Sequence, residues 1–183
     1  MARLDADSED QETLDASVRG LDGLFLLVTV GEFNAGKSAF INALLGQRVL
    51  EEGVTPTTSR ITLLTHGEQV RRQRQDDGVE LVTAPVELLR EVSIVDTPGT
   101  NAVLREHEAL TREFVPRSDL VLFITSADRP FTESERSFLE AVRDWGKKVV
   151  VALNKIDILE GPEDVSRVLS FVEEQAKAQL GLE

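Results

Sequence analysis

Short apolar runs alternate with stretches of helical periodicity along most of this 183-residue chain, and this alternation constrains its fold more than any other feature. Runs of this length are typical of strands buried on both faces of a sheet, and crossover helices join parallel strands. The pattern therefore predicts an α/β fold with a doubly wound, mainly parallel sheet and helices on both faces. The apolar runs lie at 24–30, 61–65, 92–95, 120–125 and 149–153, and the helical stretches at 39–45, 106–115, 133–145 and 163–180.

The stretch at 67–91 and the helical stretch at 133–145 carry two further structural predictions. Between 67 and 91, a basic cluster at 71–74 precedes a turn signal at 76–78, which predicts a hairpin whose arginines face solvent. Phe138 and Trp145 are spaced to share one helix face, so both are predicted to be core residues.

The first 22 residues differ from the rest of the chain. They hold seven acidic side chains against two arginines, and Leu14, Val18 and Leu21 share one helical face. We expect an acidic leader with a short helix over 1–22, followed by a single domain over 23–183.

Composition limits the partners and the cellular location that can be expected for the chain. With 20 basic and 33 acidic side chains its formal net charge is −13, so its average field repels nucleic acid and anionic lipid. It has no cysteine, which excludes disulfides and thiolate metal sites. Its apolar runs are far shorter than the roughly 20 residues that span a bilayer. These features predict a cytoplasmic protein with no nucleic-acid partner.

A glycine-containing loop, Gly-Glu-Phe-Asn-Ala-Gly-Lys-Ser at 31–38, stands directly between the first predicted strand and an apolar helix. Glycines let such a loop curl so that its backbone N–H groups point at oxygen anions, and the helix start adds partial positive charge. Lys37 is expected to reach the terminal phosphates and Ser38 to offer its hydroxyl to Mg²⁺. A chance glycine turn is the alternative, but the strand and helix on either side favour a phosphate-binding loop.

Two later segments are expected to complete the phosphate and metal site. Asp96 ends the third predicted strand, where open α/β sheets bind ligands, and is expected to hold Mg²⁺ through water while the Gly99 amide meets the γ-phosphate. The loop at 47–60 is long enough to be functional, and a threonine there is expected to bind Mg²⁺ only while a γ-phosphate is present. Thr58 is favoured over Thr57 and Thr55.

The sequence Asn-Lys-Ile-Asp at 154–157 follows the fifth predicted strand and indicates which base is bound. The Asp157 carboxylate would accept from N1–H and the 2-amino group of guanine, whereas adenine would leave it unpaired. Asn154 would brace the loop or bond to N7, and the Lys155 stem would cover a face of the ring. The alternative is a strand end followed by a charged turn. The order of the motifs favours GTP and GDP as ligands.

Taken in order, these segments resemble those of a Ras-like GTPase with a P-loop fold. Their amino-acid sequences resemble the dynamin superfamily, above all its bacterial dynamin-like and fuzzy-onion-like branches. The resemblance covers Leu24 to about Leu159. It implies a GTP-hydrolysing domain of a membrane-remodelling protein whose G domains pair as a nucleotide-dependent homodimer. It also implies peripheral membrane association only through regions outside this chain. The segments that carry it are 31–38, 40–46, 55–58, 96–102 and 126–135.

Departures from related patterns bear on hydrolysis. Thr100 stands where small GTPases place the glutamine that orients the attacking water. Asn34 matches GTPases that are similar in using a monovalent cation as charge stabiliser, so the resemblance implies K⁺ or Na⁺ held against the phosphates when two G domains meet. Alternatively, Asn34 only caps the loop by bonding to its backbone.

A second departure concerns residues after 157. A Ras-like sheet needs one more strand and a closing helix, and the dynamin-like family adds a helical stalk. Only the helical stretch at 163–180 follows here. We therefore expect a C-terminally truncated G domain with weakened nucleotide affinity and an exposed sheet edge.

The expected site combines these motifs and leaves two other functions open. One alternative is a nucleotide-gated binding module with negligible turnover, and the other is a ribosome-associated GTPase similar to Era. The residues expected to contact nucleotide are Gly31, Asn34, Ala35, Gly36, Lys37, Ser38, Ala39, Thr58, Asp96, Gly99, Asn154, Lys155 and Asp157; those expected to hold Mg²⁺ are Ser38, Thr58 and Asp96; those expected to act in catalysis are Asn34, Lys37, Ser38 and Thr58.

Overall fold

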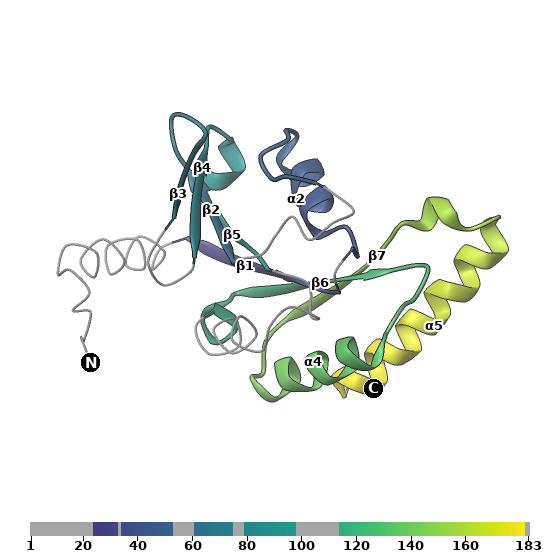
Figure 1. The fold of residues 1–183 in the computed structure, drawn as a ribbon. Helices are drawn as coiled ribbons and strands as arrows, with labels where there is room; N and C mark the ends of the chain where they lie inside the picture. Colours follow the sequence, from purple (N-terminus) through teal and green to yellow (C-terminus); the bar gives the residue numbers. More distant parts are fainter. Residues whose placement is uncertain (1–23, 33, 53–60, 75–78, 98–113, 182–183) are drawn as a thin grey trace, which may run out of the picture.

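The computed structural model describes residues 24–32, 34–52, 61–74, 79–97 and 114–181. Their core is a seven-stranded sheet with strand order β3-β4-β2-β5-β1-β6-β7, and helices lie on both of its faces (Figure 1). The strands are β1 (Phe25–Val30), β2 (Thr62–His66), β3 (Arg71–Arg74), β4 (Glu80–Ala84), β5 (Val92–Asp96), β6 (Leu120–Ser126) and β7 (Val149–Asn154). The helices are α2 (Lys37–Leu45), α4 (Glu133–Asp144) and α5 (Pro162–Leu180), with short 3-10 turns η1 (Glu87–Arg90), η3 (Val115–Arg117) and η4 (Ile156–Ile158).

The predicted parallel sheet is confirmed. Strand β1 pairs in parallel with both β5 and β6, and β6 pairs in parallel with β7. Strand β2 runs antiparallel to β5, and β3 and β4 form the predicted hairpin. The turn expected at 76–78 lies outside the described residues, as do the leader and helix expected over 1–22 and nearly all of the helix expected over 106–115.

The apolar runs form strands because each buries side chains on two faces. In β1, Leu26, Val28 and Val30 join a cluster that includes Phe138 of α4 and Val172 of α5. Leu27, between them, points into the other cluster, which includes Ile41 of α2. Alternation with period two thus buries successive residues from Leu26 to Val30 on opposite faces of the sheet, which explains why the run is almost continuously apolar.

Local signals fix the helix ends. Helix α2 ends at Gly46, which takes the left-handed conformation typical of a helix C-terminus. Helix α4 begins with a capping box, in which Thr132 and Glu135 satisfy each other's backbone N–H groups. Helix α5 starts with Pro162 and stops at Gly181, again in the left-handed region.

The prediction that Trp145 belongs to the core is wrong. Phe138 is 6% exposed, whereas Trp145 is 45% exposed. Helix α4 ends at Asp144, so Trp145 caps the helix and leaves the face that carries Phe138, Leu139 and Val142. Periodicity predicted the face but not the residue at which the helix stops.

Two edges bound the described sheet. At one end, the arginines of β3 are exposed as predicted, although Arg72 also contacts Glu80 at 3.2 Å and donates to the Val49 carbonyl at 2.8 Å. At the other end, β7 has β6 as its one neighbour among the described strands, and Val150 is half exposed. The expected exposed edge is therefore β7. None of the described helices is both long and apolar enough to cross a membrane.

We expect the exchange Phe138→Ala to lower the free energy of unfolding by about 3–5 kcal/mol, because it opens a cavity between α4 and the sheet. Trp145→Ala should cost about 1 kcal/mol or less, because that side chain is half solvated. Urea denaturation of both variants measures the difference. Equal losses would place Trp145 back in the core.

Candidate functional site

The loop that follows β1 is shaped by two glycines and by its neighbour strand. Gly31 has φ 150°, and a Cβ atom at this position would lie 2.1 Å from the Ile124 carbonyl oxygen of β6. Gly36 has φ 89° and Asn34 φ 65°. The Ala35 amide donates to the Glu32 carbonyl at 3.1 Å. The loop therefore curls tightly between β1 and α2 at a place where only glycine fits against β6. Phe33 lies outside the described residues.

The buried ammonium of Lys37 ties this loop together. Its Nζ donates to the carbonyl oxygens of Gly31 at 3.1 Å and Glu32 at 3.0 Å. Burial lowers the pKa of Lys37, and the nearby carboxylates of Asp96, Glu135 and Glu32 oppose that shift. The ammonium is thus held by two carbonyls of the loop itself, with carboxylates of other elements nearby, at a place where a phosphate group can use its charge.

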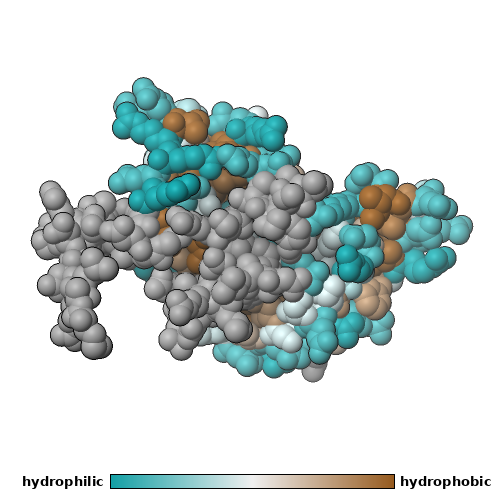
Figure 2. Space-filling view, in the orientation of Figure 1, coloured by the Kyte–Doolittle hydropathy of each residue, from teal (hydrophilic) through white to brown (hydrophobic). Residues whose placement is uncertain are grey.

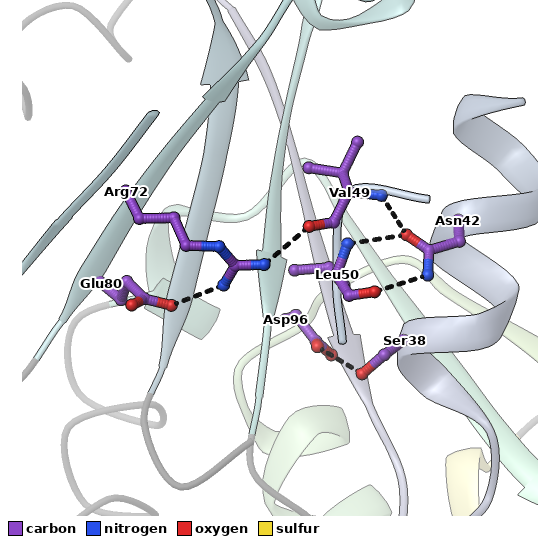
Figure 3. A network of polar contacts seen from close by, with 7 residues as sticks. All are labelled: Ser38, Asn42, Val49, Leu50, Arg72, Glu80 and Asp96. Atoms are coloured by element: carbon purple, nitrogen blue, oxygen red, sulfur yellow. Dashed lines mark hydrogen bonds and ion pairs between the residues drawn. The ribbon is translucent and has the colours of Figure 1, made fainter. Parts of the chain in front are cut away.

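Ser38 and Asp96 meet across the site (Figure 3). The Ser38 hydroxyl donates to the Asp96 carboxylate at 2.8 Å, which joins the start of α2 to the end of β5. Asp96 is fully buried, and this burial raises the pKa of its carboxyl group against the effects of Lys37, Ser38 and Thr29. A hydroxyl and a carboxylate are the hard oxygen ligands that Mg²⁺ prefers, so the pair fits the metal that the sequence predicts there.

The end of β7 reaches the same loop through Asn154. Its Nδ2 donates to the Ala35 carbonyl at 2.9 Å, and a Cβ atom on Gly36 would lie 2.3 Å from that nitrogen. This is the bracing contact that the sequence offered as one of two roles for Asn154. Lys155 then takes the left-handed conformation with φ 57°, and Asp157 is exposed in η4. The Asp157 carboxylate therefore faces solvent beside a strand that is anchored to the loop.

Most of the predicted site residues lie together. Strands β1, β5 and β7 and helix α2 bring Gly31, Ala35, Gly36, Lys37, Ser38, Asp96 and Asn154 to one end of the sheet. Asn34 and Ala39 are exposed at the loop and the start of α2, and Lys155 and Asp157 follow Asn154. The predicted contacts at Thr58 and Gly99 lie outside the described residues.

Surface hydropathy sets one end of the molecule apart. In Figure 2 an apolar patch interrupts the hydrophilic surface at the end that carries η4 and the start of α5. Ile156 and Ile158 flank Asp157 and are each 48% exposed. The carboxylate expected to select the base is therefore flanked in the sequence by two exposed apolar residues.

Asn42 is a structural residue whose role the sequence analysis missed. Its Oδ1 accepts from the amides of Val49 and Leu50, and its Nδ2 donates to the Leu50 carbonyl at 2.9 Å (Figure 3). These bonds fasten the chain after α2 to the helix itself. The expected metal-binding loop thus starts from a fixed point.

A second missed group joins the phosphate loop to α4. The Glu32 carboxylate accepts from the hydroxyls of Thr132 and Ser134, both at 2.6 Å. Next to them Glu135 is buried, which raises the pKa of its carboxyl group although Thr132 N–H and the Thr125 hydroxyl donate to it. The capping box at 132–135 was a readable signal for the helix start. Nothing local pairs it with residue 32.

Replacing Gly31 by alanine tests the loop geometry. We expect Gly31→Ala to lower the free energy of unfolding by about 3 kcal/mol or more, because backbone strain and a clash with the Ile124 carbonyl add together. Gly46→Ala is the matched control: φ is also positive, but no atom lies within 4 Å of the added Cβ, so we expect a loss of about 1 kcal/mol. Thermal unfolding of the two proteins decides between them, and equal costs would contradict the close approach to β6.

Comparison with known proteins matches this geometry to a family. The GTPase family described as 50S ribosome-binding GTPase matches residues 27–155. The chain is 47% identical over 180 residues to a probable transmembrane GTPase FZO-like, chloroplastic, of Arabidopsis thaliana, which covers 96% of this chain and 20% of that protein. It is 27% identical to a bacterial dynamin-like protein of Nostoc punctiforme, over 91% of this chain and 30% of that one. The chain thus spans a fifth to a third of these relatives.

Solved structures agree on the fold. A structure of an oligomerised bacterial dynamin pair superposes with a TM-score of 0.72 at 21% identity, over 95% of this chain and 33% of that one. Era of Aquifex aeolicus bound to GDP and AlF4⁻ superposes with a TM-score of 0.60 at 17% sequence identity, over 85% of this chain and 48% of that one. At these identities the likeness establishes the P-loop GTPase fold. With the loop, the Ser38–Asp96 pair and Asn154 at one end of that fold, the chain belongs to the GTPase family described as 50S ribosome-binding GTPase, and its relatives include FZO-like and bacterial dynamin-like proteins.

Proposed function

We propose that this chain binds and hydrolyses GTP as the G domain of a longer dynamin-like protein that acts at a membrane. The observation that carries the proposal is the convergence of Lys37, the Ser38–Asp96 pair and Asn154 at one end of the sheet. The names of the relatives support the proposal that the protein acts at a membrane. One relative is called a transmembrane GTPase, and the bacterial dynamin pair is described as sensing and tethering membranes. We further propose that residues 23–183 form the G domain, that 1–22 form a leader, and that the longer protein carries the remaining strand, helix and stalk.

Each residue has a role in the proposed reaction. Hydrolysis transfers the γ-phosphoryl group to water, breaks its bond to the β–γ bridging oxygen and leaves GDP and phosphate. Lys37 places its charge at the phosphates, and the loop amides between Gly31 and Ser38 bind their oxygens. Ser38 and Asp96, with Thr58, would hold Mg²⁺, which neutralises charge that develops on the phosphate oxygens.

Base recognition is proposed to rest on Asp157. The Asn154 side chain donates a hydrogen bond to the Ala35 carbonyl, so it fixes the position of the strand end rather than serving only as a free donor. Asp157 is exposed and stands two residues after the left-handed Lys155. Its two oxygens suit the paired donors of guanine, and the stem of Lys155 is long enough to lie along the ring.

The exchange Asp157→Asn tests this assignment. We expect the variant to lose about 100-fold or more of its preference for GTP and to favour xanthosine triphosphate, because an amide can donate to the 2-oxo group that replaces the amine. Competition against a fluorescent guanine nucleotide measures both affinities. Asp144→Asn, at the far end of α4, is the control: it removes the same charge and should change neither the affinity for GTP nor that for xanthosine triphosphate. A variant that still prefers GTP would place the base elsewhere.

The catalytic role of Asn34 is proposed to involve a monovalent cation and a second G domain. Asn34 is exposed in the loop with a left-handed backbone at φ 65°. Its oxygen is therefore open to a K⁺ or Na⁺ ion bound against the phosphates. The oligomerised state named for the bacterial dynamin pair supports the pairing of G domains.

Turnover in different salts tests this role. We expect GTP hydrolysis to be about tenfold faster or more in KCl than in choline chloride, and to rise per molecule with protein concentration, because the ion and the partner both add charge stabilisation. Asn34→Ala should remove the salt effect. The same turnover in both salts, independent of concentration, would refute the proposal and favour a nucleotide-gated module with negligible hydrolysis.

A ribosome-associated role is the second candidate. The family description and a 31% identity over 132 residues to Era of Thermotoga maritima favour it. The net charge of −13 opposes it, because ribosomal RNA presents a dense array of phosphates. Sedimentation with ribosomes and with anionic vesicles, compared for the full-length protein in GTP, separates the two candidates.

A further inference from the structure

The contact between the phosphate loop and α4 has no part in the reaction as described above. We name it the loop–helix contact and define it as Glu32 with Thr132 and Ser134. One oxygen of the Glu32 carboxylate accepts from both hydroxyls at 2.6 Å, and all three side chains are partly buried. Two short bonds from hydroxyls to a carboxylate are charge-assisted and stronger than ordinary neutral hydrogen bonds. They join positions 100 and 102 residues apart in the sequence.

The position of Glu32 makes this contact consequential. Its backbone carbonyl holds the Lys37 ammonium at 3.0 Å, while its side chain reaches the first turn of α4. A carboxylate in the second position of a phosphate-binding loop would repel phosphate if it were free to turn towards the ligand. At the start of α4, by contrast, the helix dipole and two hydroxyl donors favour a negative charge, although the buried carboxylate of Glu135 lies close enough to oppose it.

We infer that Glu32 is a positioning residue for nucleotide binding. Its carboxylate is held at the start of α4 by Thr132 and Ser134, which keeps its charge away from the phosphates and keeps its carbonyl on Lys37. The inference rests on nucleotide binding by this loop and not on the membrane or the dimer. The ligand concerned is the polyphosphate group of a guanine nucleotide, so the affinity for GDP is enough to test the role of Glu32.

The exchange Ser134→Asp breaks the loop–helix contact without weakening the helix. An acidic residue in the first turn of α4 is favourable for the helix, but it stands against Glu32 and removes a donor. We expect the affinity for GDP to fall about tenfold or more, because charge-assisted hydrogen bonds are replaced by repulsion. The thermal midpoint of the ligand-free variant should fall by about 4 °C or less, because the favourable effect of an acidic residue at the helix start offsets part of the lost bond. Glu32→Gln alone keeps an acceptor oxygen but replaces two charge-assisted bonds by neutral ones without adding repulsion, so its GDP affinity should fall less than that of Ser134→Asp.

Two double variants separate the contact from net charge. In Glu32→Gln/Ser134→Asp the new amide donates to the new carboxylate, so GDP affinity should return to within about threefold of wild type. In Glu133→Gln/Ser134→Asp the net charge is restored on the same helical turn, but Glu133 is exposed and is not part of the contact, so affinity should stay low. All affinities are measured by competition with a fluorescent GDP analogue.

The outcomes are distinct. Equal recovery in both double variants would reduce the effect to net charge and overturn the inference, and so would wild-type affinity in Ser134→Asp. A Ser134→Asp variant that is largely unfolded at the assay temperature without ligand would assign the contact to folding and also overturn it. A wild-type domain that binds no GDP would instead refute the proposed function, which is a separate failure.

Discussion

The arrangement of the site depends on a buried ammonium group. Lys37 is fixed by the carbonyls of Gly31 and Glu32 and lies near the carboxylates of Asp96 and Glu135. Removing a charge from water is costly unless acceptors surround it, so the loop must keep its curled form around the ammonium. That form in turn requires Gly31, because a side chain there would strike the Ile124 carbonyl. A single charge thus links the loop, α2, β5 and β6.

The parallel order of the central strands explains why these groups meet. Strands β5, β1, β6 and β7 run in one direction, so their carboxyl ends share one edge of the sheet. Asp96 ends β5, the phosphate loop follows β1, and Asn154 ends β7. The hydrogen bond from Asn154 to Ala35 and the bond from Ser38 to Asp96 then fix the strand ends relative to the loop. The residues proposed for base recognition and metal binding are thereby attached to one frame.

Particular residues show where sequence reasoning succeeded. The five apolar runs became strands, four of them buried in the body of the sheet and the fifth, β7, at its edge with Val150 half exposed. A pattern that needs no turn geometry is readable without a structure. The glycine, lysine and serine at fixed short spacings in 31–38 also predicted a phosphate-binding loop, and the structure brings Gly31, Lys37 and Ser38 together at one end of the sheet. Trp145 was misplaced because its exposure depends on the residue at which α4 ends, and periodicity continues past that residue.

The sequence by itself determined the doubly wound sheet, the phosphate loop at 31–38 and the positions of Asp96, Asn154 and Asp157, because all of these follow from local spacing and from burial with a short period. Only the tertiary structure decided that Asn154 braces the loop at Ala35 and that Glu32 is held by Thr132 and Ser134. Those contacts join residues about 100 positions apart or more, and their partners are set by the order of strands in the sheet. Local sequence carries no record of that order, so the fold had to bring the groups together before their chemistry was visible.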